Sequence, residues 1–285
     1  MKLKDRLFPN RKKPKLVDRI KTPSFPFLPV PRPIGTSKAG RRLLEGLAIN
    51  RPVYLDLCRE IVNSREQLSA VPARTVSPEL PHWFNGYMPP LDAMILYTLL
   101  RLRNPKTYLE IGSGNSTKMA RKAIRDHRLR TRIISIDPVP RAEIDTLCDE
   151  VIRKPFQDVG EEALSWLEDG DIVFQDGSHH AFTNNDTTVF FTEFLPEIPR
   201  GVDWGIHDIF LPDDYPAIWY KRFYNEQYVL LTYLLAGACG DQPLFPAYYV
   251  GRDAELRQQL EGIFDLPALQ EKQRFHGTSF WMRRP

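Results

Sequence analysis

The sequence predicts an α/β fold built on a doubly wound, mostly parallel sheet. Short apolar runs typical of buried strands alternate along the chain with segments whose apolar residues recur at helical spacing. Polar residues follow these runs at the carboxyl ends of the predicted strands, where ligands bind in sheets of this kind. Those polar residues are Glu110, Asp137, Asp158, Asp176, His207 and Asp208.

Five apolar runs form the predicted strands, and helical segments connect them. The strands cover residues 107–111, 132–136, 171–174 and 202–206, with a weaker strand at 151–152. Helices are predicted at residues 91–102, 116–126, 142–148, 161–167 and 187–195. This alternation is typical of a parallel sheet, because each parallel pair needs a crossover connection.

Two further segments precede this part of the chain, which is placed at residues 86–285 as the main domain. Residues 1–38 mix prolines with lysine and arginine and are expected to form an extended arm. The arm either wraps the domain or the partner subunit of a homodimer, or it is a frayed tail. Residues 39–85 form a helical extension, which Pro52 is expected to break into two helices.

Charge, hydropathy and cysteine usage exclude several classes of protein. A net charge of +3 is too small to predict a nucleic-acid-binding face. The most apolar segment, residues 228–239, is too short to cross a bilayer and is expected to be a buried helix. The three cysteines lie far apart without metal-like spacing, so a reducing, cytoplasmic location is expected.

The loop after the first main strand has the features of a cofactor-binding turn. Its glycines allow close approach of a ligand, and the helix that follows offers free N–H groups. A dinucleotide motif would have a third glycine where Thr117 stands, which counts against an NAD-dependent oxidoreductase. The loop residues expected to bind a cofactor are Glu110, Gly112, Ser113, Gly114 and Ser116. Asp176, which follows a later strand, is expected to bind the cofactor as well.

Asp137 ends the second of these strands, directly before Pro138. A carboxylate at this place is able to accept hydrogen bonds from both ribose hydroxyls of a nucleoside. The alternative interpretation is a turn residue. The glycine-containing loop next to it favours cofactor binding.

Five motifs give the sequence a specific resemblance. They are EIGSGNST at 110–117, SIDP at 135–138, DGSH at 176–179, HDIFLPDDYP at 207–216 and NEQY at 225–228. On these motifs the chain, from about Gly86 to its end, resembles a bacterial branch of Rossmann-fold S-adenosylmethionine methyltransferases. The resemblance implies a seven-stranded sheet and S-adenosylmethionine as cofactor. It also implies that Glu110 lies near the methionine amine, with Gln157 and Asp158 near the adenine.

Asp176, His179, His207 and Asp208 follow strands that are neighbours in a doubly wound sheet, so they are expected to converge beside the cofactor. Carboxylates with one further ligand suit Mg²⁺. The segment resembles metal-dependent O-methyltransferases, which implies that Asp176, His207 and Asp208 bind the metal and that His179 is the general base. His207 stands where those relatives usually have an acid, so the alternative is a metal-free site with His207 as a base.

Each of these four residues also has a plainer interpretation. His179 and His180 could form a solvated pair, His207 could be a core histidine, and Asp208 could be a turn residue. The convergence of four such residues on two adjacent strand ends favours an active site.

The function expected from the sequence is transfer of the sulfonium methyl group to a hydroxyl oxygen. The resemblance implies a sugar, glycan or other small molecule as the acceptor. The alternative is a cofactor-binding or scaffold protein without turnover. No nucleic-acid partner and no membrane span are expected.

Overall fold

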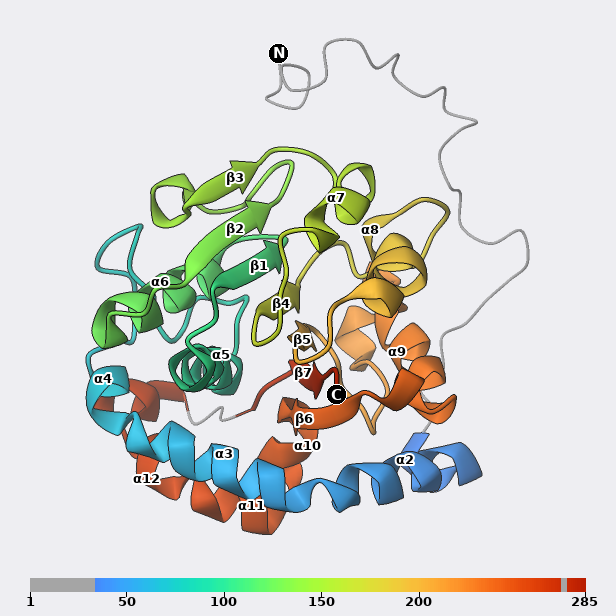
Figure 1. Ribbon diagram of the computed structural model, residues 1–285. Helices are drawn as coiled ribbons and strands as arrows, with labels where there is room; N and C mark the ends of the chain where they lie inside the picture. Colours follow the sequence, from blue (N-terminus) through green and yellow to red (C-terminus); the bar gives the residue numbers. More distant parts are fainter. Residues whose placement is uncertain (1–33, 273–275) are drawn as a thin grey trace. The chain divides into compact units, whose positions relative to one another are not determined.

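The computed structural model describes residues 34–272 and 276–285 and contains the expected sheet. Seven strands lie in the order β3-β2-β1-β4-β5-β7-β6 (Figure 1). β1 to β5 pair in parallel, and β7 pairs antiparallel with β5 and β6. The prediction of a doubly wound, mostly parallel, seven-stranded sheet is confirmed. The strands are β1 (Thr107–Ile111), β2 (Arg132–Ile136), β3 (Glu150–Ile152), β4 (Ile172–Gln175), β5 (Asp203–Ile206), β6 (Gln242–Pro246) and β7 (Phe280–Arg283).

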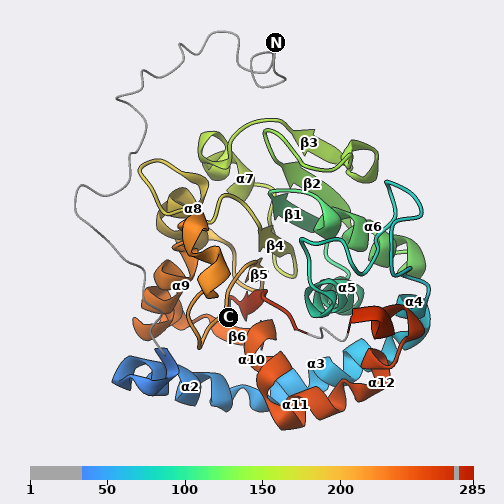
Figure 2. The ribbon, with the colours of Figure 1, turned by 180° about the vertical axis from the view of Figure 1, so that it is seen from behind.

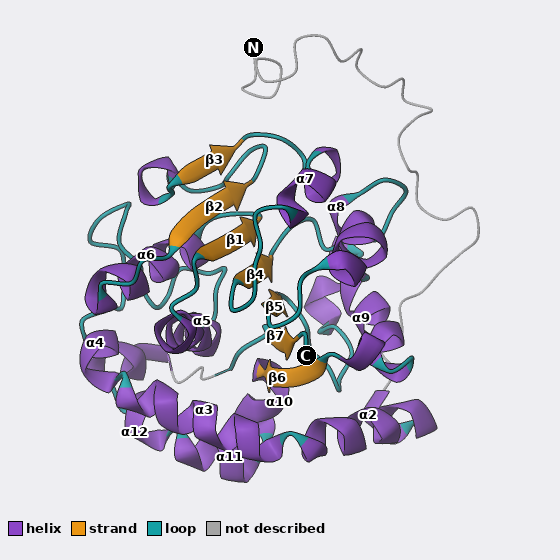
Figure 3. Cartoon of the chain, viewed as in Figure 1, coloured by secondary structure: helices purple, strands orange, loops and turns teal. Residues whose placement is uncertain are grey.

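Helices cover both faces of the sheet and the end of the domain at β6 (Figure 3). Those before β1 are α2 (Lys38–Ile49), α3 (Arg51–Asn63), α4 (Arg65–Ser69) and α5 (Pro90–Arg103). Those within the parallel part are α6 (Asn115–His127), α7 (Gly160–Leu164) and α8 (Asp186–Val189). Those after β5 are α9 (Glu226–Leu235), α10 (Ala247–Arg252), α11 (Ala254–Gln259) and α12 (Glu261–Phe264).

The sheet has a hydrophobic core on each face, because successive residues of a strand point to opposite sides. Tyr108 of β1 packs into a core with side chains of α3, α5 and α6. Leu109, the next residue, packs into the other core with side chains of α2, α7, α8 and α9. Adjacent residues at each strand end therefore face opposite sides of the sheet, and parallel pairing places the carboxyl ends of β1 to β5 at one edge.

The helical extension shares a core with the C-terminal part of the chain. α3 lies along α11 and α12, as seen from behind in Figure 2, and Tyr54 and Ile61 of α3 are fully buried there. The break between the first two helices falls at Asn50 rather than at Pro52. Pro52 lies in the first turn of α3, where a missing N–H leaves no helical hydrogen bond unmade.

Three predicted helices differ from the structure. Residues 142–148 form only a 3-10 turn, Asp145–Leu147, which is enough to bury Ile144 and Leu147. Helix 161–167 ends earlier, as α7. Helix 187–195 begins as α8 and continues as a π-helical turn, Phe190–Phe194, and a 3-10 turn, Leu195–Glu197.

The prediction that residues 228–239 form a buried helix is wrong in part. α9 covers most of the segment, but Tyr228 is 41% exposed, and Leu230 is the apolar residue of α9 that is buried. The apolar residues of α9 are spread around the helix, and Leu230 is the one that is fully buried in the core shared with α2. Within the described residues, no helix is long and apolar enough to cross a membrane. Residues 1–33 of the expected arm lie outside the described residues.

Candidate active site

A cavity of about 330 Å³ opens at the carboxyl ends of β1, β2 and β4. Five residues expected to bind the cofactor line it: Gly112, Ser113, Asp137, Gln157 and Asp176. Arg141, Ser178, Asn185 and Asp186 also line it, although the sequence did not mark them as ligands of the cofactor. Parallel pairing explains the convergence, since it aligns Ile111, Ile136 and Gln175 at one edge of the sheet.

Gly112 brings the first loop against the end of β4. Its φ is +79°, and an added Cβ would lie 2.0 Å from the carbonyl oxygen of Asp176. The loop is held there by the N–H of Gly112, which donates to Ile136, and the N–H of Asp176, which donates to Ile111. The glycine is therefore required both by its conformation and by this contact.

Asp137 lies at the mouth of the same cavity. One carboxylate oxygen accepts from the N–H of Ser113 at 2.9 Å, and the other accepts from the N–H of Val139 at 2.8 Å. These backbone bonds fix the orientation of the carboxylate and leave lone pairs on both oxygens for a ligand.

Glu110 does not line the cavity. Its carboxyl group is fully buried, accepts from the hydroxyl of Tyr108 at 2.8 Å and contacts the hydroxyl of Thr117. The same Thr117 oxygen accepts from the N–H of Gly114, which caps α6. Glu110 therefore organises the start of α6 behind the loop. Burial raises the pKa of Glu110 to about 7.

Three other residues that were expected to bind the cofactor also lie outside the cavity. Gly114 is the N-cap of α6, and Ser116 is buried in the first turn of that helix. Asp158 ends the 3-10 turn Phe156–Asp158 and lines a separate hollow with Gly160 and Glu193. Adjacent residues of a 3-10 helix point about 120° apart, and of this pair only Gln157 lines the cofactor cavity.

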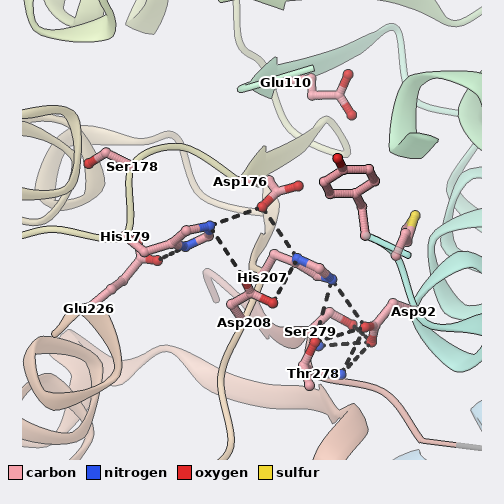
Figure 4. A network of polar contacts seen from close by, with 12 residues as sticks. Asp92, Glu110, Asp176, Ser178, His179, His207, Asp208, Glu226, Thr278 and Ser279 are labelled. Atoms are coloured by element: carbon pink, nitrogen blue, oxygen red, sulfur yellow. Dashed lines mark hydrogen bonds and ion pairs between the residues drawn. The ribbon is translucent and has the colours of Figure 1, made fainter. Parts of the chain in front are cut away.

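A compact polar cluster adjoins the cavity at Asp176 (Figure 4). The Nε2 atom of His179 lies 3.3 Å from Asp176 and 3.4 Å from Asp208. The Nδ1 atom of His207 lies at the same two distances from these carboxylates. The side chain of Asp176 is 32% exposed, whereas that of His179 is 5% exposed. Asp176 is therefore the member of the cluster that faces the cavity.

Two buried carboxylates hold the histidines from behind. Glu226 of α9 contacts Nδ1 of His179 at 2.8 Å, and Asp92 of α5 contacts Nε2 of His207 at 3.2 Å. Asp92 also accepts hydrogen bonds from the backbone and hydroxyl groups of Thr278 and Ser279. The sequence analysis missed both roles. A lone aspartate in an apolar helix was a signal for Asp92, and the NEQY motif was one for Glu226.

Comparisons with known proteins now bear on this site. Residues 109–209 match the family model described as a methyltransferase domain, and the match includes the loop, Asp176, His179, His207 and Asp208. The matched part of the chain resembles a methyltransferase domain. The expectation of a methyltransferase is confirmed at this level.

Three solved structures are similar to this chain with low TM-scores and low sequence identity. A cofactor-bound protein from MTB, Rv0187, has a TM-score of 0.38 and 12% identity, over 88% of this chain and 94% of that one. The SAH-bound Podospora anserina methyltransferase PaMTH1 has a TM-score of 0.40 and 14% identity, over 92% and 99%. An O-methyltransferase from Bacillus cereus in complex with SAH has a TM-score of 0.35 and 13% identity, over 85% and 100%. No curated protein matches the sequence.

Two residues of the polar cluster have strained backbone conformations. His179 has a φ of +61° and Asp208 a φ of +60°, in the left-handed region that side chains other than that of glycine rarely adopt. Each lies in the loop after a strand of the sheet. Such strain is concentrated at functional sites, where the surrounding packing maintains it.

In the cluster, the carboxylates favour the charged form of the histidines, and the histidines favour the charged form of Asp176. Burial alone would lower the pKa of His179 and of His207, but contacts with the surrounding carboxylates raise the pKa of both well above the usual range. Burial would raise the pKa of Asp176, but the charge of His207 and contacts with both histidines lower it. Burial raises the pKa of Asp208 and of Glu226. These pKa directions favour charged forms of His179 and His207 beside the ionised carboxylate of Asp176.

The donor set closest to that of a metal site is Asp176, His179 and Asp208. One ligand atom from each lies within 4.8 Å of the others. The set inferred from the sequence had His207 in place of His179. In the structure Asp92 fixes one nitrogen of His207, and its other nitrogen contacts the same two carboxylates.

Proposed function

We propose that the protein transfers the methyl group of S-adenosylmethionine to a hydroxyl oxygen of a small-molecule acceptor. The observation that carries this proposal is the cluster of Asp176, His179, His207 and Asp208 at the edge of the cavity. Four acid–base groups beside a nucleoside-sized cavity suit removal of a hydroxyl proton during methyl transfer.

The cofactor would occupy the cavity at the strand ends. Asp137 is oriented to bind the ribose hydroxyls, Gln157 to contact the adenine, and the N–H groups of the loop at Gly112 and Ser113 to contact the rest. Glu110, Gly114 and Ser116 support the loop from behind. Asp158 is left out of this assignment because it does not line the cavity.

The chain's own groups supply positioning and a proton acceptor. The rigid loop and the cluster would hold the sulfonium and the acceptor oxygen in line, which accounts for much of the rate of such transfers. We assign proton removal to His207, whose Nε2 is fixed by Asp92 and whose Nδ1 faces Asp176 and Asp208. Nδ1 of His207 would accept the proton of the acceptor hydroxyl. S-adenosylmethionine, when bound, would supply the methyl group to the hydroxyl oxygen and would leave as S-adenosylhomocysteine.

The residues present fit a divalent cation. Two carboxylates and one imidazole with mutually close ligand atoms are a donor set that suits Mg²⁺ or Mn²⁺. Asp176, His179 and Asp208 would hold the cation, and a bound cation would lower the pKa of a coordinated acceptor hydroxyl. His179 binds a metal only when it is neutral, so cation affinity is expected to rise with pH.

The acceptor is proposed to be a sugar or glycan hydroxyl. Aromatic rings line the approach to the cluster: the ring of Tyr224 lies 4.6 Å from that of His179 and 5.7 Å from that of Trp219. Phe223, next to Tyr224, is 51% exposed. Rings beside carboxylates suit an acceptor with apolar faces and several hydroxyl groups.

The cofactor assignment is tested by ligand-induced stabilisation. S-adenosylhomocysteine at 100 times its Kd is expected to stabilise the fold by about 2.7 kcal/mol. Asp137→Asn should weaken this binding, and Asp158→Asn, outside the cavity, is the matched control. No thermal shift in the wild type would contradict the cofactor assignment.

The catalytic assignment is tested by turnover with a panel of sugars and glycans. His207→Gln should abolish turnover while S-adenosylhomocysteine still binds, and His179→Gln should chiefly weaken activation by Mg²⁺ or Mn²⁺. Wild-type turnover should rise with pH, because the accepting imidazole must first be neutral. A His207→Gln variant with wild-type turnover would contradict the assignment of proton removal to His207. Turnover that a chelator leaves unchanged would contradict the proposed role of a divalent cation.

A further inference from the structure

A second hollow lies between α6 and the segment at residues 70–81. It encloses about 150 Å³, and the described residues that line it differ from those that line the cofactor cavity. Four cationic side chains of α6 border it: Lys118, Arg121, Lys122 and Arg125. Their spacing places them on one side of the helix. Two carboxylates, Glu79 and Asp126, also line the hollow, so its lining carries an excess of positive charge.

Two of the four cations have partners in the protein. Arg121 pairs with Asp149 at 2.7 Å and donates to the carbonyl of Leu147 at 2.7 Å. Lys122 pairs with Asp126 at 2.8 Å. These contacts fix the walls of the hollow and neutralise much of their charge.

Lys118 differs from both. It is 7% exposed, and among the residues that the structure describes its ammonium group has neither a hydrogen bond nor an ion pair. Burial lowers its pKa. Burial also lowers the pKa of nearby His82, and the charge of Lys118 lowers it further. The Nδ1 atom of His82 is itself buried without a partner in the described structure.

A largely buried lysine side chain with an unpaired ammonium group is costly, because it loses part of its hydration without gaining a counter-ion. The protein tolerates this cost at a hollow that Arg125 also borders. The most direct way to recover the free energy is an anion from solution. The volume is several times that of one water molecule, about 30 Å³, and below the roughly 300 Å³ of sites for drug-sized ligands.

We propose that this hollow binds the phosphate group of a small molecule or inorganic phosphate. Lys118 donates to the phosphate oxygens, and the exposed Arg125 contributes a second charged donor. Phosphate and similar oxyanions match this combination, because ammonium and guanidinium groups make short charge-assisted hydrogen bonds to them. The site does not depend on the proposed methyl transfer.

The test is a titration of the full chain with inorganic phosphate and, separately, with a sugar monophosphate, followed by thermal unfolding. Chloride at equal ionic strength is the reference. Either phosphate should raise the unfolding temperature above that in chloride, and the tighter-binding form identifies the source of the phosphate group. Lys118→Met should weaken apparent phosphate affinity roughly tenfold, the effect of losing one charge-assisted hydrogen bond. Arg125→Met should weaken it several-fold, and Arg130→Met, which removes an exposed charge elsewhere, should leave it unchanged.

The proposal fails if phosphate and sugar phosphate stabilise no more than chloride, or if Lys118→Met keeps the wild-type response. Should Lys118→Met not fold, an unchanged response in Arg125→Met overturns the proposal, and a weakened one supports it. S-adenosylhomocysteine is titrated in parallel. Its shift should persist in Lys118→Met, and a joint loss of both shifts would overturn a separate site. No shift in the wild type would contradict only the proposed methyltransferase cofactor.

Discussion

At the scale of single residues, the site depends on two carboxylates that do not face the cavity. Glu226 and Asp92 are fully buried, and each contacts the nitrogen of a histidine that points away from Asp176 and Asp208. Each contact fixes the ring orientation and determines which nitrogen faces the cluster. Glu226 and Asp92 are therefore positioning residues for His179 and His207.

Glu226→Gln should lower turnover or cation activation about 10–100-fold, the usual effect of removing such a support. The amide keeps the size of the side chain but loses the charge that raises the pKa of His179. S-adenosylhomocysteine affinity should stay unchanged, and the pH profile should shift to lower pH. Glu45→Gln, at an exposed position of α2, is the matched control. A variant with the wild-type rate and pH profile would contradict the positioning role.

Glu110 predicts a pH dependence of stability. Its pKa is about 7 in the folded chain against an ordinary value of 4.5, because burial penalises the charged form. The neutral form stabilises the fold fully below about pH 4.5, and this contribution is lost as the pH rises through about 7. The difference corresponds to about 3 kcal/mol.

Urea unfolding of the wild type and of Glu110→Gln at a series of pH values measures this effect. The variant should gain stability relative to the wild type between pH 5 and pH 8, because its side chain does not ionise. A difference that is constant over this range would show that Glu110 titrates normally.

At the scale of elements, the loop between β1 and α6 is limited by the close approach of β4. Gly112→Ala would place a methyl carbon against the carbonyl of Asp176 at a positive φ. The variant should lose S-adenosylhomocysteine binding and several kcal/mol of stability through overpacking and strain. Gly46→Ala is the matched control, because an added Cβ there meets nothing within 4 Å. In the interior of α2 it should raise stability by about 0.5–1 kcal/mol. Equal effects of the two substitutions would contradict the close-approach argument.

At the scale of the whole molecule, buried charge contacts join distant parts of the chain around the sheet. Asp203 of β5 is fully buried and pairs with Arg283 of β7 at 2.7 Å and with Arg103 of α5 at 3.0 Å. Asp92 makes a similar connection between α5, β5 and the start of β7. These contacts hold the C-terminal strand, on which the position of His207 depends.

Asp203→Asn should reduce the free energy of unfolding by about 1.5–3 kcal/mol, because the buried side chain loses charge-assisted hydrogen bonds from two partly exposed guanidinium groups. Urea unfolding checks this. Asp56→Asn is the matched control, because the Asp56–Arg59 pair is exposed and should contribute less than about 1 kcal/mol. Similar losses in the two variants would show that Asp203 is not a buried connection.

Much of the fold was determined by local sequence. β1 and β2 have the predicted bounds, and apolar spacing predicted the order of the first five strands, whereas β6 and β7 were not predicted from it. Parallel pairing then requires that the strand ends meet, which is why Asp176, His179, His207 and Asp208 could be predicted to converge. The glycine loop was recognisable for the same reason, since a tight turn leaves a signal at adjacent positions.

Tertiary structure alone decided how these groups are used. Asp92 lies 115 positions from His207, and Glu226 lies 47 positions from His179. No short-range pattern encodes such contacts, because they arise from the packing of α5 and α9 on the sheet. Packing also set the burial that raises the pKa of Glu110, excluded Asp158 from the cavity and left the ammonium of Lys118 unpaired. The sequence by itself determined which residues gather at the edge of the sheet, and the packed fold determined which way each side chain faces and what charge it holds.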